Sequence, residues 1–328
     1  IERCNKVPGI HAEFAKIGHP FPSGTNTHDP NEPAVLNQNR HATCVDCHSA
    51  HASNQTTAFT AAPTVRPSQN MVIGVNGGDG ITTVYPAVNQ YENCLRCHGT
   101  STGKITDLKY GYFPARLVSA GDPLNVISQF SLSSISSHPI TRERSSPFAQ
   151  VHLRTNMLQL DGLTQGRLMG TRILCTDCHN SDDNREFGGV GPNGPHGSKW
   201  THILERRYES SQAAVPGDAV SNLFPSPDLT VNGPYAMCAK CHDLNLVLSP
   251  TSWAGHATHV GADGLSCSTC HTAHGMGATS ATISGERLIN FDANVVAANG
   301  STAITFQHTP QPTCTLSCHG HAHSSAHY

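Results

Sequence analysis

The feature that most constrains this chain is a repeated pair of cysteines that ends in histidine. The chain has 13 Cys and 22 His in 328 residues. Twelve of the cysteines form six close pairs, and a histidine directly follows each pair. Five pairs read C-x-x-C-H, and the sixth has one extra residue, C-x-x-x-C-H. The cysteines are, in order, Cys44 and Cys47, Cys94 and Cys97, Cys175 and Cys178, Cys238 and Cys241, Cys267 and Cys270, and Cys314 and Cys318.

The motif C-x-x-C-H is the attachment signal for c-type haem. Two thiols one helical turn apart can each form a thioether with one vinyl group of the same porphyrin, and the histidine that follows then reaches the iron. The sequence therefore predicts six covalently bound haem c groups. The histidines expected to bind iron from the motif side, here called the proximal histidines, are His48, His98, His179, His242, His271 and His319.

Other uses of the cysteine pairs explain the pattern less well. Cysteines this close rarely form a disulfide that stabilises a fold, and a disulfide gives no reason for the histidine. Zinc sites with four sulfur ligands also use C-x-x-C pairs, but they do not require a trailing histidine six times. The longer pair could be a decayed site, yet it still ends in Cys318 and His319, so we expect haem there too. Cys4 has no free partner cysteine and is expected to be a lone buried thiol, with an intermolecular contact or a role near a haem as the alternatives.

The composition fits a core that is not made mainly of side chains. Aromatic residues are only 6% of the chain and charged residues only 13%, and the formal net charge is −3. A chain so poor in large apolar residues builds little core, but disorder would normally come with a high net charge. Six flat apolar porphyrins would supply the missing buried surface. We therefore expect one elongated unit over residues 1–328: mostly irregular and haem-cored, with short helices at the haem motifs and little β-sheet.

Other segments give weaker signals. The chain contains 29 Gly and 21 Pro, and residues 53–80 and 210–232 are expected to be loops or linkers. Residues 153–168 and 200–211 are further helix candidates. No apolar run is long enough to span a membrane. The near-neutral charge and the lack of a basic patch argue against nucleic acid as a partner.

The second axial ligand of each iron decides the chemistry. Sixteen histidines remain after the proximal ones, against five methionines, so we expect a histidine on the far side of each iron. Such ligation gives low-spin iron at low potential, which suits electron transfer rather than substrate binding, and we expect no catalytic residue. The candidates for this distal position, eight for six places, are His19, His51, His138, His196, His256, His259, His274 and His323.

Spacing and local context select these candidates. His51 and His274 each follow a proximal histidine by three residues, which is the same helical face. Such a side chain cannot reach the far side of its own iron, so it must bind a neighbouring haem. His323, four residues after His319, could act in the same way.

The remaining candidates lie in loops. Proline follows His19 and His138 and stiffens the backbone there. His196 lies in the glycine- and proline-rich segment 191–198, where glycine allows the backbone to approach a porphyrin edge closely. His256 and His259 form an H-x-x-H pattern before the fifth motif. This pattern is similar to one in small tetrahaem cytochromes of sulfate reducers, where the resemblance implies that both histidines ligate, to different haems.

The stretch from residue 137 to the end resembles multihaem cytochromes of metal-reducing and soil bacteria. The number of haem motifs and the low content of large apolar and charged residues also resemble those of the outer-surface cytochromes that polymerise into filaments, the cytochrome nanowires. That resemblance implies export, a continuous haem chain and an axial histidine donated across the subunit boundary. The matching phrases are Ser137-His-Pro, Cys175-Thr-Asp-Cys-His-Asn-Ser-Asp, Gly194-Pro-His-Gly-Ser, Met237-Cys-Ala-Lys-Cys-His-Asp, Leu288-Ile-Asn-Phe-Asp and Cys314-x-x-x-Cys-His-Gly.

The expected function is electron transfer along a row of six haems, outside the cell or at its surface and otherwise in the periplasm. The expected partners are further copies of the chain in a head-to-tail filament, redox proteins and extracellular acceptors such as metal oxides. His51 is the first choice for a ligand that crosses the junction, with His11 and His19 as alternatives. Equally, His51 could bind the second haem of its own chain. The competing functions are a monomeric periplasmic shuttle and a multihaem reductase, which would keep one iron open to substrate.

Overall fold

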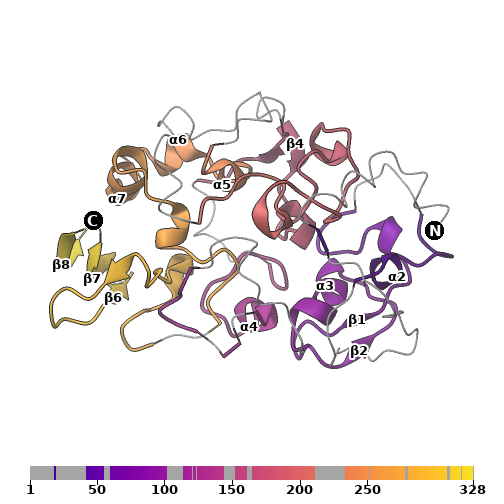
Figure 1. Ribbon diagram of the computed structural model, residues 1–328, viewed down its shortest axis with the longest axis horizontal. Helices are drawn as coiled ribbons and strands as arrows, with labels where there is room; N and C mark the ends of the chain where they lie inside the picture. The colour runs from indigo at the N-terminus through magenta and orange to yellow at the C-terminus, as the bar shows by residue number, and fades with distance from the viewer. Residues whose placement is uncertain are drawn as a thin grey trace.

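The computed structural model describes residues 18–19, 42–54, 60–101, 114–119, 121–122, 124–143, 152–160, 165–210, 233–250, 252–277, 280–308, 311–318 and 320–327. In this part of the chain, short helices and small antiparallel sheets are joined by long irregular segments (Figure 1). The expected mostly irregular architecture with short helices is confirmed.

The helices are short and many coincide with the cysteine motifs. The α-helices are α2 (Cys44–Cys47), α3 (Gln90–His98), α4 (Val126–Phe130), α5 (Ala236–Ala239), α6 (Leu244–Val247) and α7 (Ala254–His256). The 3-10 helices are η2 (Pro67–Gln69), η4 (Cys175–Asp177), η5 (Arg185–Phe187), η6 (Thr201–Ile203), η10 (Cys267–Thr269) and η11 (Glu286–Leu288), and η9 (Ala257–Ala262) is a π-helix. No helix in the described ranges has the length and apolar character needed to cross a lipid bilayer.

The sheets are small and antiparallel. The strands are β1 (Gly74–Val75), β2 (Thr83–Val84), β3 (Asn156–Leu158), β4 (Gln165–Leu168), β5 (Val296–Ala297), β6 (Thr305–Gln307), β7 (Thr313–Cys318) and β8 (His321–His327). β1 pairs with β2, β3 pairs with β4, and β7 pairs with β5, β6 and β8.

Acidic side chains inside two of the motifs stabilise the start of each motif turn. The Thr43 N–H donates to Asp46 Oδ2 at 2.8 Å, and the Leu174 N–H donates to Asp177 Oδ2 at 2.7 Å. Each carboxylate therefore satisfies a backbone donor that a helix of one turn leaves unpaired. This explains why turns too short to be stable alone form at these cysteines.

The hydrophobic clusters are modest and contact the motif cysteines. One cluster, near β6 and β7, contains Met276, Phe291 and Phe306, and the half-buried Cys270, Cys314 and Cys318 pack against it. Another contains Phe130, Ile140, Met157, Leu160, Ile173 and Phe187, and Cys175 and Cys241 pack against it. The apolar core therefore lies next to the thiols rather than in a separate layer.

Three expectations about secondary structure are wrong. The sixth motif lies in strand β7 rather than in a helical turn. Residues 153–168 contain strands β3 and β4 because their backbone bonds to the fourth motif, with Leu158 N–H donating to Lys240 O at 3.0 Å. Residues 200–210 contain only the short 3-10 helix η6 and are otherwise irregular, because they bridge two motifs: Glu205 N–H donates to Cys178 O at 2.9 Å, and Met237 N–H donates to Arg207 O at 2.9 Å. Residue 211 of that candidate lies outside the described residues, as do 211–232 of the expected linker.

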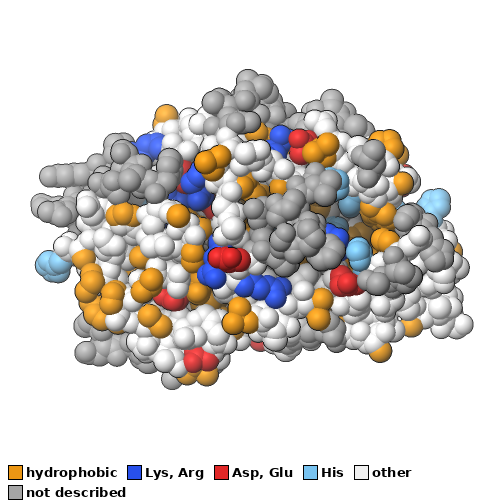
Figure 2. Space-filling model, turned by 180° about the vertical axis from the view of Figure 1, so that it is seen from behind, with side chains coloured by type: hydrophobic (Ala, Val, Ile, Leu, Met, Phe, Trp, Pro, Cys, Tyr) orange, Lys and Arg blue, Asp and Glu red, His pale blue; other side chains and the backbone are white. Residues whose placement is uncertain are grey.

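The motifs follow the long axis of the molecule. Figure 1 shows α2 and α3 at one end, α5 further along and β7 and β8 at the opposite end. Figure 2 shows a face on which hydrophobic side chains are scattered and charged ones are few, and on which histidines lie at both ends. The order of the motifs in the sequence is therefore also their order in space.

Candidate functional site

Four of the motifs share one hydrogen bond that fixes the geometry of the turn. The N–H of the proximal histidine donates to the carbonyl oxygen of the first cysteine, at 2.8 Å for His48 and at 2.9 Å for His179, His242 and His271. The second motif lies in helix α3, which ends at His98. In each of these five motifs both cysteines and the histidine therefore lie on one turn, as haem attachment requires.

Each of these five proximal histidines faces a second imidazole from a distant part of the chain. The distances between ring centroids are 6.0 Å for His48 and His196, 6.1 Å for His98 and His19, 6.1 Å for His179 and His274, 6.5 Å for His242 and His138, and 6.3 Å for His271 and His256. A further pair, His259 and His323, is separated by 5.8 Å.

These separations match two imidazoles on opposite sides of one metal ion. A metal–imidazole bond is about 2.0 Å, and the nitrogen lies about 1.1 Å from the ring centre, so the centroids should be roughly 6.2 Å apart. Six pairs at 5.8–6.5 Å fall close to that value. Seven of the eight distal candidates occur in these pairs, and the exception is His51.

The orientation of many rings is set by the backbone. A carbonyl oxygen can only accept, so Nδ1 carries the proton and Nε2 is left as the metal ligand. The Nδ1–H groups donate from His48 to Ser68 O at 2.7 Å, from His138 to Ala273 O at 2.6 Å, from His179 to His202 O at 2.8 Å, from His271 to Arg287 O at 2.9 Å, from His19 to Pro195 O at 3.0 Å and from His259 to Gly255 O at 2.8 Å.

The third and fifth motifs use the same strained turn to supply this acceptor. His202 and Arg287, whose carbonyls accept from the proximal histidines, have positive φ values of 63° and 58°. Left-handed backbone is costly for residues other than glycine. Because this strained backbone occurs at two sites, we infer that the turn serves to position the carbonyl oxygen that accepts from the proximal histidine.

Burial keeps the paired imidazoles neutral. Burial lowers the pKa of His242 and of His274 to about 3, and that of His196 and of His256 to about 4. Burial also lowers the pKa of His138, His179, His271 and His323. Because only neutral imidazole has a free lone pair for a metal, these side chains are in the protonation state that metal ligation requires at neutral pH.

The distal histidines lie together in pairs that serve successive motifs. The loop 194–197 carries His196 for the first motif, and its Pro195 carbonyl holds His19 for the second. Two glycines allow this approach: Gly194, before Pro195, has φ +103°, and a Cβ on Gly18, before His19, would lie 2.7 Å from His196 O.

The same arrangement recurs twice. The segment 273–274 carries His274 for the third motif, and its Ala273 carbonyl holds His138 for the fourth. His256 and His259 lie one turn apart. His256 faces His271 of the fifth motif, and His259 faces His323. The motifs are thus grouped as first with second, third with fourth, and fifth with sixth; we call these groups the N-terminal, central and C-terminal units.

The thiols connect neighbouring motifs across and within these units. The Cys94 thiol is hydrogen-bonded to that of Cys175, and the Cys238 thiol to that of Cys267. Within units, Cys47 interacts with both Cys94 and Cys97, Cys178 with Cys241, and Cys270 with both Cys314 and Cys318. Every motif is therefore close to the one before and the one after it.

No known protein family, curated protein or solved structure matches this chain. The interpretation of the site therefore depends on its own chemistry.

That chemistry bears on the two other uses of the cysteines. The twelve cysteines of the six motifs, all of which lie in the described ranges, form no disulfide. In the same ranges, no three His, Cys, Asp or Glu side chains gather as a metal-ion cluster. Burial raises the pKa of Cys47, Cys178 and Cys270 to about 12, which favours the thiol over the thiolate that zinc requires.

The sixth motif borders a cavity that could hold a large apolar group, although the backbone of the motif is extended. An apolar cavity there is lined by Cys314, Cys318, His259, His323 and aromatic side chains that include Phe291 and Phe306. Four strand residues span about 13 Å, more than one helical turn, so both thiols could reach one porphyrin only if β7 bends. The donor set fits haem, but the local backbone fits it less well than at the other five motifs.

Some predicted site residues are not brought to a second imidazole. His51 is exposed. His319, Cys4 and His11 lie outside the described residues. At the sixth motif the imidazole that faces His259 belongs to His323, which lies on β8 opposite Leu316 of β7.

Charged residues inside the motifs form contacts that were not predicted from the sequence. The residue before the second cysteine is Asp46 in the first motif and Arg96 in the second, and the two form a buried ion pair at 3.0 Å. In the third and fourth motifs the equivalent residues are Asp177 and Lys240, and Lys240 Nζ donates to Asp177 O at 2.6 Å. The signal was visible as charged residues of opposite sign at one motif position.

Proposed function

We propose that this protein is a six-haem c-type cytochrome that carries electrons along a row of haems, each held between two histidines. The observation that carries the proposal is the facing of proximal and distal imidazoles at 6.0–6.5 Å in five motifs. A single such pair could arise from packing alone. Five pairs that each include a motif histidine are explained together by five irons.

The residues present fit the cofactor at most of the sites. Two thiols on one turn, a proximal histidine and an opposed imidazole form a complete set at each of the first five motifs. At the sixth, the apolar cavity supplies both thiols and an imidazole pair, His259 and His323. When bound, haem supplies a one-electron ferric/ferrous couple at each site.

The protein's own contribution is to fix ligands and exclude water. At the first, third and fifth motifs, backbone carbonyls accept from the Nδ1–H of the proximal histidine, so that its Nε2 is left for the iron. Burial keeps the imidazoles neutral and surrounds the thiols with apolar side chains. A rigid site with both axial positions filled changes little between two redox states, which suits electron transfer rather than binding of a substrate.

The succession of close thiols supports a continuous path. Contacts join each motif to the next, from Cys47 beside Cys94 to Cys270 beside Cys318. Because electron transfer needs cofactor edges almost in contact, this spacing favours conduction over the whole length. An isolated structural role for any one site would not require such order.

We further propose that the protein works outside the cytoplasm, at or beyond the cell surface, and that copies join head to tail as a filament. Non-closing heterologous contacts generate such filaments. The acceptors would be redox proteins or extracellular metal oxides. A monomeric periplasmic shuttle is the alternative, and a reductase is disfavoured because a second imidazole already opposes each proximal histidine of the first five motifs.

Electron paramagnetic resonance of the oxidised protein tests the electron-transfer assignment. We expect only low-spin ferric signals, because every iron has two imidazole ligands. A high-spin signal amounting to one iron per chain would contradict this and would favour the reductase.

A further inference from the structure

The N-terminal and central units meet at a contact between the second and third motifs. Helix α3, which carries the second motif, packs against η4, which begins the third. The thiols of Cys94 and Cys175, the first cysteines of these two motifs, are hydrogen-bonded to each other. An electron that passes from the second site to the third therefore crosses the unit boundary at this contact.

A buried amide joins the two motifs beside the thiols. Gln90 is 0% exposed and lies one helical turn before Cys94, on the same face of α3. Its Nε2 donates to Thr176 Oγ1 at 3.1 Å, and its Oε1 accepts from the Thr176 N–H at 3.2 Å. Because Thr176 directly follows Cys175, the amide holds the third motif at the point where its first thiol begins.

Helix α3 does not need the Gln90 side chain for its own start. Glu92 already accepts from the backbone N–H groups of Asn89 and Val88, at 3.0 Å and 2.8 Å. These bonds satisfy donors that the first turn of a helix leaves unpaired. The Gln90 amide is therefore left to bond across the unit boundary.

Gln90 is also fixed from within its own unit. Its Nε2 donates to Gln69 Oε1 at 3.3 Å. Gln69 follows Ser68, whose carbonyl oxygen accepts from the proximal His48 of the first motif. A buried amide with all of these partners has little freedom to move, because each lost bond would leave a polar group unsatisfied.

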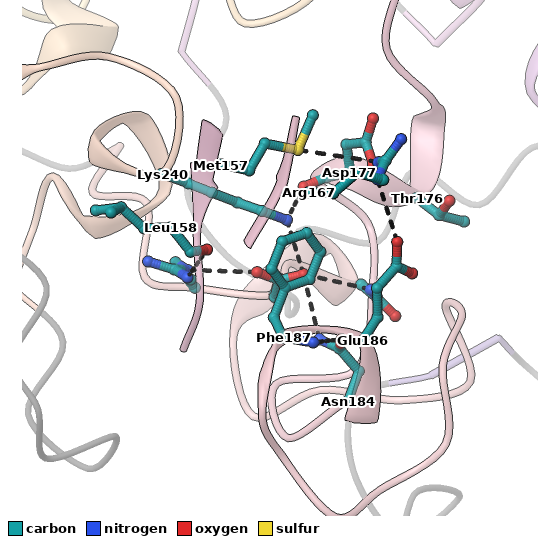
Figure 3. A network of polar contacts seen from close by, with 12 residues as sticks. Met157, Leu158, Arg167, Thr176, Asp177, Asn184, Glu186, Phe187 and Lys240 are labelled. Carbon is teal, nitrogen blue, oxygen red and sulfur yellow. Dashed lines mark hydrogen bonds and ion pairs between the residues drawn. The ribbon is translucent and has the colours of Figure 1, made fainter. Parts of the chain in front are cut away.

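A series of ion pairs makes a second link between the same two units. Arg66, directly before the η2 helix that contains Gln69, is 2.8 Å from Glu186, and the Glu186 side chain is only 1% exposed. Arg167 Nε is 3.4 Å from Glu186, and Arg167 also pairs with Asp177 inside the third motif. Figure 3 shows these contacts of Arg167 together with Thr176. The third motif is thus held against the N-terminal unit from two sides.

The boundary between the central and C-terminal units repeats the arrangement. The first cysteines of the fourth and fifth motifs are hydrogen-bonded to each other as well. Ser268 occupies the motif position of Thr176, directly after the first cysteine, and is also buried. Its hydroxyl donates to Glu209 O and Ser210 O, each at 3.3 Å, in the segment before the fourth motif. A hydroxyl residue at one motif position therefore bonds across both unit boundaries, next to a contact of thiols.

We propose that Gln90 is the positioning residue for electron transfer between the second and third haems. It binds no iron and carries no electron, and it acts by holding the attachment points at Cys94 and Cys175 in contact. In the step itself the electron that the ferrous iron of one haem loses is gained by the ferric iron of the other, so no further reactant is needed. This inference rests on the proposed function.

Flash photoreduction of the haem-loaded protein tests the inference. A ruthenium photosensitiser on the exposed His51 delivers electrons near the first motif. In every protein compared, His274→Ala removes the imidazole that faces His179, so that the third haem becomes high-spin and its reduction has its own absorbance. We expect Gln90→Leu to slow the arrival of electrons at the third haem severalfold, because the two attachment points are no longer held together.

Electron paramagnetic resonance of the oxidised proteins, with His274 in place, reports the same distance without electron transfer. Neighbouring ferric haems broaden each other's signals, so Gln90→Leu should narrow the signals of two haems while all six irons stay low-spin. A merely structural role would lower the denaturant midpoint of the variant and leave the line widths and the arrival rate as in the wild type.

Gln69→Leu is the matched control, because it removes the bond that Gln90 makes within its own unit and leaves both bonds to Thr176. It should keep the wild-type rate and line widths. Thr176→Val removes only the hydroxyl and should slow the transfer less than Gln90→Leu does, and it provides the test if Gln90→Leu does not fold.

The outcomes separate this inference from the proposed function. Six haems in Gln90→Leu with an unchanged rate and unchanged line widths, or equal slowing in Gln69→Leu, would overturn the positioning role. If only Thr176→Val folds, an unchanged rate in that variant would overturn it. A wild-type chain whose intact mass shows no haem would instead refute the proposed function.

Discussion

At the scale of single residues, burial lowers the pKa of several of the paired imidazoles and so favours their neutral form, which metal ligation requires. Folded pKa values of about 3 for His242 and about 4 for His196 lie well below the unfolded value of about 6.5. As the pH falls below about 6.5, the unfolded chain takes up protons before the folded one does. Burial of neutral histidines therefore favours unfolding in acid.

We predict a corresponding pH dependence of stability. The free energy of unfolding should be constant above about pH 6.5 and should fall steadily toward about pH 4, since protons bind the unfolded state in that window. Denaturant midpoints measured across this range, with the low-spin absorbance as the probe, check it. A midpoint that increases as the pH falls would contradict the account.

His196 offers a test of one axial position. His196→Ala should convert one haem of the six to high spin, because the imidazole that faces His48 at 6.0 Å is lost. The chain should remain folded, since the loop 191–198 contributes little apolar core. Resonance Raman or electron paramagnetic resonance counts the high-spin irons.

His51→Ala is the matched control for this variant. His51 follows the same proximal histidine but is exposed. Its removal should leave all irons low-spin. A high-spin iron in His51→Ala but not in His196→Ala would reverse the assignment.

At the scale of elements, the sixth motif is the most unusual. It has an extra residue, and it lies in β7, where β8 brings His323 rather than a neighbouring loop residue to His259. We predict that His323→Ala gives one high-spin haem, while His321→Ala, two residues away on the same strand and exposed, gives none. Low-spin spectra in both variants would mean that other residues provide the ligands at this site.

The motif turns could be predicted from sequence, whereas the segments between them could not. A helical turn at Cys175 follows from local spacing and from the Asp177 cap. Residues 153–168 have a helical pattern, but their hydrogen bonds go to the fourth motif, a long-range contact that no local signal encodes. The strand at Cys314 was missed because the motif was assumed to dictate a turn.

The histidines that face the proximal ones could be predicted only in part, because local sequence selects candidates but long-range contacts decide the pairs. Composition and local context selected eight candidates, and the structure pairs seven of them with a second imidazole. The partners could not be assigned, because His274 crosses from the fifth motif to His179 of the third. The expectation that His274 binds a neighbouring haem agrees with this pairing. The same spacing also selected His51, which the structure leaves exposed.

At the scale of the whole molecule, the pairing of histidines within one chain predicts whether filament assembly depends on His51. His48 already faces His196 of the same chain, so a filament would not need His51 to cross the junction. We predict that His51→Ala assembles as the wild type does, which negative-stain microscopy of both proteins at equal concentration checks. Variant protein that stays monomeric, with one high-spin haem, would show that His51 acts across the junction.

The central claim is that six haems are attached covalently, two cysteines to each. Intact mass spectrometry of the purified, denatured protein tests it most directly, because thioethers survive denaturation. We predict that the measured mass equals that of the polypeptide plus six haems, and that none of the twelve motif cysteines carries a free thiol. A mass with five haems would remove the site at Cys314 and Cys318, and the mass of the bare polypeptide would contradict the account as a whole.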